Sequence, residues 1–143
     1  MFDLEQIKYH NIQESFGMGG PYLGELEFNG NDISGKFLAD SEILNEDKSK
    51  IVFSRLLTQY SGGFQGLKSK RDFRIFIYDT NENKFFQSKE SFECLAIEKM
   101  ERNQITFHRS FHTKIYKYRD SIDFNMTNFD EIEITTHNNM HKS

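Results

Sequence analysis

The chain has 143 residues, of which 36% are hydrophobic and 28% are charged, and it contains 15 Phe and 6 Tyr. A chain of this size and composition forms one domain and buries a core, which excludes a multidomain machine and a disordered tail. The single cysteine, Cys94, excludes an internal disulfide and a multi-cysteine zinc site. We expect Cys94 to be a small buried side chain inside a strand.

The N-terminal segment has no features of a secretory signal. It carries Asp3 and Glu5 and lacks an apolar stretch behind a basic start. No run in the chain approaches the roughly 20 apolar residues of a membrane-spanning helix. We therefore expect a cytoplasmic protein without a membrane partner.

Charge is distributed unevenly along the chain, which has a net charge of −4. Residues 1–47 contain ten acids and two bases, residues 48–119 seven acids and fifteen bases, and residues 120–143 five acids and one base. Blocks of opposite sign can pair with one another across a folded sheet. Alternatively, the acidic blocks form a face that repels nucleic acid and attracts a basic protein. The sequence leaves both interpretations open.

The first elements in the chain are predicted to be strands. No segment sustains the spacing of an amphipathic helix, apart from one short helical turn expected near residues 40–44. Residues 22–28 and 32–37 are expected to form a hairpin, because the Asn29-Gly30 pair between them favours a type I′ turn.

The same alternation continues to the end of the chain. Asp and Asn side chains in residues 79–83 favour a turn between neighbouring strands, and therefore a second hairpin. The remaining expected strands are 51–56, 73–78, 84–87, 92–99, 104–109, 114–119, 122–127 and 131–135. About eight short strands separated by polar turns predict one all-β domain over residues 1–143, an antiparallel β-sandwich or half-propeller-like pair of sheets. Residues 137–143 are expected to be a frayed tail.

Two glycine-rich stretches, residues 17–21 and 61–66, lack the spacing of a dinucleotide-binding or phosphate-binding loop. The second leads into a basic and aromatic segment, residues 64–76, which is a pattern found in single-strand nucleic-acid platforms. Such proteins carry a basic footprint over the whole domain, whereas this chain has a sequence pI of about 5.7. We therefore expect no nucleic-acid partner.

No motif indicates a catalytic or metal centre. His108 and His112 are close in sequence. On an extended segment their side chains would lie about 13 Å apart, so they could share a metal ion only if a turn brought them together. An enzyme that uses this pair for acid–base chemistry remains an alternative. We expect no enzymatic activity, no metal and no cofactor.

Parts of the chain resemble known protein families. Residues 50–56 and 74–84 are similar to the middle strands of a β-propeller blade, where a strand ends at an Asp-Thr turn, and residues 92–107 resemble the start of a second blade. Together with the stretch FGMGGPYLG at residues 16–24, this small acidic all-β chain resembles bacterial immunity proteins of polymorphic-toxin and contact-dependent growth-inhibition systems. The resemblance implies a cytoplasmic inhibitor, without catalytic residues, that binds a cognate toxin domain, commonly a nuclease.

Such an inhibitor presents carboxylates to the basic active site of a nuclease. Exposed aromatic side chains in the glycine-punctuated segments then serve as anchors. The expected partner-binding residues are Asp40, Glu42, Glu46, Asp47, Asp120, Asp123, Tyr22 and Phe64. The alternative function is that of a lipocalin-like β-barrel that binds a small apolar ligand, which requires an internal cavity.

Overall fold

The computed structural model describes residues 6–14, 21–28, 30–60, 70–111, 118–134 and 136–138. These residues form strands and no α-helix, so none of them belongs to a helix able to cross a membrane. The strands are β1 (Ile7–Glu14), β2 (Tyr22–Phe28), β3 (Asn31–Leu38), β4 (Ile43–Leu44), β5 (Lys50–Tyr60), β6 (Lys70–Asp79), β7 (Lys84–Ser88), β8 (Ala96–Glu101), β9 (Gln104–His108), β10 (Arg119–Asp123), β11 (Phe129–Ile132) and β12 (Thr136–Asn138). The predicted all-β fold is confirmed.

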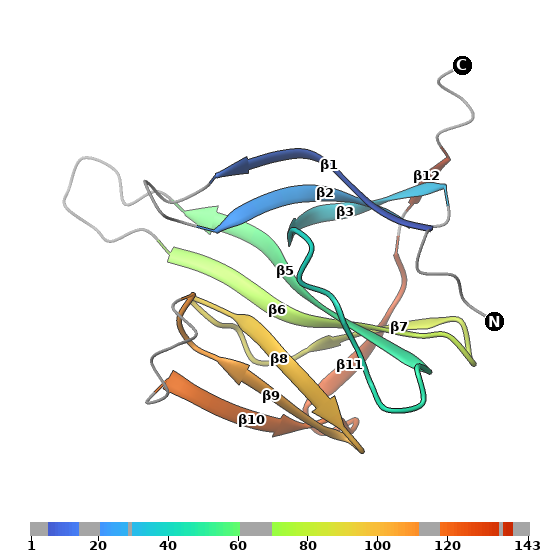
Figure 1. Ribbon diagram of the computed structural model, residues 1–143, viewed down its shortest axis with the longest axis vertical. Helices are drawn as coiled ribbons and strands as arrows, with labels where there is room; N and C mark the ends of the chain where they lie inside the picture. Colours follow the sequence, from blue (N-terminus) through green and yellow to red (C-terminus); the bar gives the residue numbers. More distant parts are fainter. Residues whose placement is uncertain are drawn as a thin grey trace.

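The strands form two antiparallel sheets (Figure 1). The large sheet has the order β1-β2-β3-β5-β6-β7-β11, with β4 also paired to β5 and β12 to β3, while the small sheet has the order β10-β9-β8. Phe73, Ile75 and Ile77 of β6 share one buried cluster with Ile105 and Phe107 of β9. The small sheet therefore packs on one face of the large sheet.

The large sheet curls because β3 bends at Gly35. The start of β3 pairs with β12 and its end with β5, and the register between β2 and β3 shifts where Gly35 adopts a φ of +97°. The ring of Phe28 on β2 consequently lies 4.6 Å from that of Tyr78 on β6, although two strands separate them in the sheet.

A second buried cluster fills the concave side of this curl. Phe37, Phe53 and Phe76 pack there with ring centroids 5.4 to 5.9 Å apart. Among the described strands, β1 and β11 end the sheet without pairing to each other, so the sheet is not closed into a barrel. The open sheet does not support the alternative of a lipocalin-like barrel that binds a small apolar ligand.

Both predicted hairpins are confirmed. Phe28 pairs with Asn31, which leaves a two-residue turn with Gly30 at a φ of +83°. In the second hairpin Asp79 pairs with Lys84, and the Asp79 carboxylate accepts hydrogen bonds from two backbone amides of the turn.

Several strand boundaries differ from the prediction. Residues 40–44 do not form a helical turn, because Ile43 and Leu44 pair with β5 as β4. The strand expected at 92–99 begins only at Ala96, since Phe92 makes an isolated bridge to β6 and the chain bends before β8. Cys94 lies in that bend, half-buried, rather than inside a strand.

The C-terminal part was also predicted imperfectly. Residues 122–127 do not form one strand, because β10 ends at Asp123 and the side chain of Asn125 accepts hydrogen bonds from the backbone amides of a following turn. The expected strand at 114–119 falls mostly outside the described residues. The tail expected at 137–143 pairs with β3 through Asn138, and residues 139–143 lie outside the described part of the chain. Of the strand expected at 131–135, only Glu131 and Ile132 lie in a strand, since β11 begins at Phe129 and ends at Ile132, and residue 135 lies outside the described residues.

Candidate functional site

Three of the five acids in residues 120–143 form ion pairs with bases from the middle of the chain. Lys84 lies 3.5 Å from Glu131 and Lys89 lies 3.8 Å from Asp130, on the paired strands β7 and β11 and the turn beside them. At these two positions charges from the middle and the C-terminal blocks pair with one another, as one of the two interpretations of the charge blocks expects.

Asp120, a predicted partner-binding residue, takes part in the same neutralisation. Its carboxylate lies 2.9 Å from the guanidinium of Arg109 and accepts a hydrogen bond from the backbone amide of Ser121. These contacts hold the pKa of Asp120 below its usual value, the backbone hydrogen bond most of all. Because Asp120 is already ion-paired with Arg109, it is not part of the candidate site.

The N-terminal acids are arranged differently. In the described part of the chain, none of the following carboxylates forms an ion pair with Lys, Arg or His: Glu14, Asp40, Glu42, Glu46 and Asp47. Glu25 and Glu27 on β2 do form ion pairs, Glu25 with Lys36 and Glu27 with His10. Five described acids of the N-terminal block are therefore without an ion pair, and outside this block the same holds, among the described residues, for Glu82, Glu93, Asp123 and Glu133.

Two of these acids, Glu14 and Asp40, lie beside Tyr22 at the start of β2. The backbone amide of Ala39 donates to the carbonyl of Tyr22 at 2.9 Å, which places Asp40 next to this tyrosine. The hydroxyl of Tyr22 donates to Glu14 on β1 at 3.3 Å, and 56% of Tyr22 is exposed. The sequence therefore predicted Tyr22 and Asp40 independently, and the structure brings them together.

Tyr9 forms a hydrogen bond with another of these acids, Glu42. The Tyr9 hydroxyl donates to the Glu42 carboxylate at 2.6 Å, joining β1 to the segment before β4. Burial raises the pKa of the Tyr9 hydroxyl, and the nearby charges of Glu42 and Asp40 raise it further. Both carboxylates therefore lie close to this phenol. We call the group of Ile12, Glu14, Tyr22, Asp40 and Glu42 the Tyr22 corner. Ile12 belongs to it because its side chain lies against Gly24 of β2.

Glu46 and Asp47 lie at a separate loop. They line a hollow of about 350 Å³ together with Asn45, Lys50, Arg102 and Asn103. Glu46 accepts a hydrogen bond from the backbone amide of Arg102, and Asp47 accepts one from that of Ser49 at 3.0 Å. The hydrogen bonds to Ser49 lower the pKa of the Asp47 carboxyl. Both acids thus hold turns in place, although they also remain exposed.

Two predicted residues complete the set. Asp123 ends β10 opposite Gln104, near the same turn, because the amide of Phe124 donates to the carbonyl of Asn103 at 2.6 Å. Phe64 lies outside the described residues. The structure therefore separates the predicted residues into the Tyr22 corner, the loop of Glu46 and Asp47 with Asp123 nearby, and the ion-paired Asp120.

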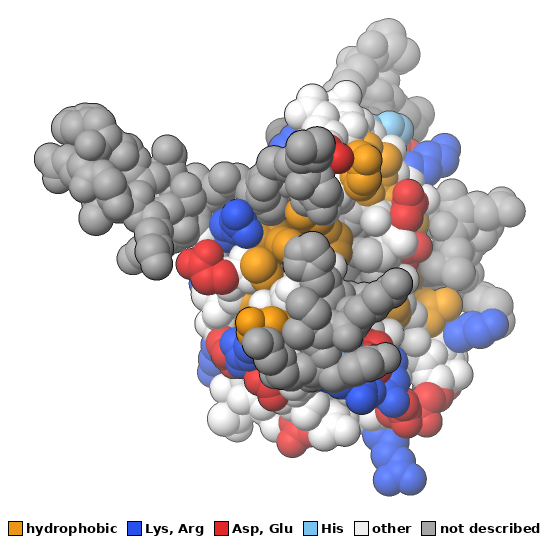
Figure 2. Space-filling view, turned by 60° about the vertical axis from the view of Figure 1, so that its left-hand side comes forward, with side chains coloured by type: hydrophobic (Ala, Val, Ile, Leu, Met, Phe, Trp, Pro, Cys, Tyr) orange, Lys and Arg blue, Asp and Glu red, His pale blue; other side chains and the backbone are white. Residues whose placement is uncertain are grey.

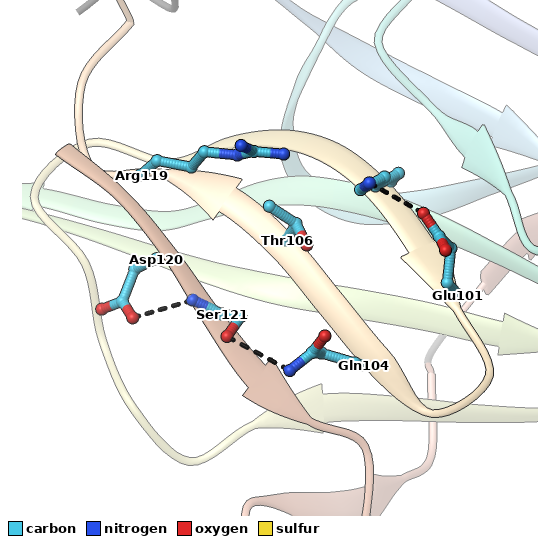
Figure 3. Close-up of a pocket in the computed structure, with 7 residues that line it drawn as sticks. Glu101, Gln104, Thr106, Arg119, Asp120 and Ser121 are labelled. Atoms are coloured by element: carbon cyan, nitrogen blue, oxygen red, sulfur yellow. Dashed lines mark hydrogen bonds and ion pairs between the residues drawn. The ribbon is translucent and has the colours of Figure 1, made fainter. Parts of the chain in front are cut away.

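The sequence did not predict a hollow of about 640 Å³ on the outer face of the small sheet (Figure 3). It is lined by Lys99, Glu101, Gln104, Thr106, Arg119, Asp120 and Ser121. Lys99 lies 2.8 Å from Glu101, and Arg119 lies 2.7 Å from Glu98. Because each cation has a carboxylate beside it, the hollow has no net preference for an anion or a cation.

His108 is a structural residue of this sheet. The register of β8 shifts between Ile97 and Lys99, and the extra residue, Glu98, contacts His108 Nε2 at 2.8 Å. The side chain of His108 is only 3% exposed, and its Nδ1 is buried without a hydrogen-bond partner in the described part of the chain. This burial does not suit acid–base chemistry on a substrate. His112, its expected companion, lies outside the described residues.

The described residues contain no group of three or more His, Cys, Asp or Glu side chains that could hold a metal ion. No protein-family model, curated protein or solved structure matches the chain. The candidate site therefore depends on the geometry and charge of the chain itself.

Proposed function

We propose that this protein is an immunity protein that binds a cognate toxin domain, a nuclease with a basic active site, and covers that site with an acidic surface. The observation that carries the proposal is that five N-terminal carboxylates, three in the Tyr22 corner and two in the loop before β5, form no ion pair among the described residues. The resemblance of the sequence to immunity proteins supports the same function.

The distribution of ion pairs supports this proposal on physical grounds. Uncompensated charges on one part of a surface steer an oppositely charged partner and speed association. A nuclease binds phosphate with Lys, Arg and His, so carboxylates presented at its active site compete for the same positive potential. We place the protein in the cytoplasm, where such an inhibitor protects nucleic acid.

Titration calorimetry tests the proposal. The protein is titrated with the C-terminal domain of the protein encoded immediately upstream of its gene. We expect a dissociation constant in the nanomolar range or below, and an association rate that falls as salt is raised, because exposed charges are screened. No heat of binding at several temperatures, with both proteins folded, would contradict the proposed function.

A further inference from the structure

Two exposed hydrophobic side chains lie together in the Tyr22 corner. Ile12 is 44% exposed and Tyr22 56% exposed. A Cβ atom built on Gly24 would lie 3.0 Å from Ile12 Cγ1, so the side chain of Ile12 lies directly over Gly24. Tyr22 and Gly24 are alternate residues of β2 and face the same side of the sheet. Ile12 and Tyr22 therefore expose apolar side chains near one another on the same face of the sheet.

This surface extends the concave-side core to the solvent. Leu26 and Phe28 follow on the same face of β2 and are buried in that core. Gly24 has no side chain, which allows β1 to approach closely at this position. A Cβ atom there would lie 3.1 Å from the carbonyl oxygen of His10. Apolar side chains on this face thus continue from the buried core to the exposed residues Ile12 and Tyr22.

Carboxylates lie beside this apolar surface. Glu14 accepts a hydrogen bond from Tyr22, Asp40 follows the residue bonded to the Tyr22 carbonyl, and Glu42 is held by Tyr9. On the face turned forward in the space-filling view, hydrophobic side chains reach the surface between acidic and basic ones (Figure 2). An apolar centre with a charged rim is the usual composition of a protein-binding surface.

We infer that the Tyr22 corner is the docking surface for the partner, and that it receives a basic segment carrying an Arg or Lys beside an apolar side chain. The apolar side chain covers Ile12, while the cation lies against the Tyr22 ring and the carboxylates of Glu14 and Asp40. Charge complementarity selects this occupant, because three carboxylates without an ion pair disfavour an acidic or purely apolar partner. This inference rests on the proposed function and specifies where it acts.

The first experiment measures the affinity of variants for the upstream-encoded domain. We expect Tyr22→Ala to weaken binding at least about thirtyfold, as for an aromatic residue at an interface centre, and Asp40→Asn to slow association most at low salt. Met126→Ala is the matched control, because Met126 is 54% exposed and lies in a turn far along the chain. Circular dichroism confirms that each variant is folded.

The second experiment needs no toxin domain. N-acetyl-arginine amide is titrated into ¹⁵N-labelled protein, with N-acetyl-glycine amide as the control probe. We expect the largest amide shifts at Ile12, Tyr22 and Asp40, and no comparable shifts with the control probe. Larger shifts at Glu46 and Asp47, or shifts spread evenly over the surface, would overturn the assignment of this docking surface.

The two experiments separate failure of the surface from failure of the function. If the toxin domain binds tightly and Tyr22→Ala binds equally well, the docking surface is wrong and the proposed function stands. If the arginine probe binds at the Tyr22 corner and the toxin domain does not bind, the immunity function is wrong and the corner remains a surface for a different basic partner.

Discussion

Replacing Gly35 with Ala tests how the large sheet is bent. Gly35 has a φ of +97°, where a side chain costs about 1 to 2 kcal/mol. The new Cβ would also lie 3.0 Å from Arg55 Nε and 3.4 Å from the carbonyl oxygen of Leu56. Arg55 has little freedom to retreat, because it is 6% exposed and its guanidinium donates to the Ser34 carbonyl and to Gln87.

Displacing the guanidinium weakens hydrogen bonds from a charged group, worth about 1.5 to 3 kcal/mol. We therefore expect Gly35→Ala to lower the free energy of unfolding by about 2.5 to 5 kcal/mol in all. Gly30→Ala is the control, because Gly30 also has a positive φ of +83° and a Cβ there meets nothing within 4 Å. It should cost only the conformational part, about 1 to 2 kcal/mol.

Urea unfolding followed by circular dichroism measures both variants. Equal destabilisation by the two substitutions would refute the reasoning, because it would mean that the Arg55 side chain moves away from the new Cβ atom without any loss in the free energy of unfolding. In an Arg55→Met background the extra penalty of Gly35→Ala should shrink, since the two residues are in contact and their effects are coupled.

Three further predictions concern single side chains. Tyr9→Phe should lower the free energy of unfolding by about 1 to 2 kcal/mol in urea, because a hydrogen bond to the Glu42 carboxylate is lost. Glu98→Gln should destabilise the fold above pH 4.5, the ordinary pKa of this carboxyl, and the difference from wild type should vanish as pH falls, since the hydrogen bond from His108 lowers the Glu98 pKa; a difference independent of pH would contradict this. Iodoacetamide should alkylate Cys94 more slowly than a cysteine peptide at pH 8, because burial raises the pKa of its thiol; equal rates would show that the thiol is not shielded.

Sequence reasoning worked best where the determinants are local. The Asn29-Gly30 and 79–83 turns were predicted because turn residues act within a few positions of the chain. It failed for β1, whose side chains are mostly exposed and show little alternation of apolar residues. Missing β1 also hid Ile12 and Glu14, which belong to the proposed docking surface.

The sequence by itself determined the all-β class, the two hairpins and the division of charge into blocks. Only the tertiary structure decided which charges remain unpaired. Lys84 and Glu131 are distant in the chain and meet because β7 pairs with β11, whereas Asp40 meets Tyr22 because β2 pairs with β3. Charge along a chain is set by composition, but charge on a surface depends on strand order, and strand order follows from how the apolar faces are buried.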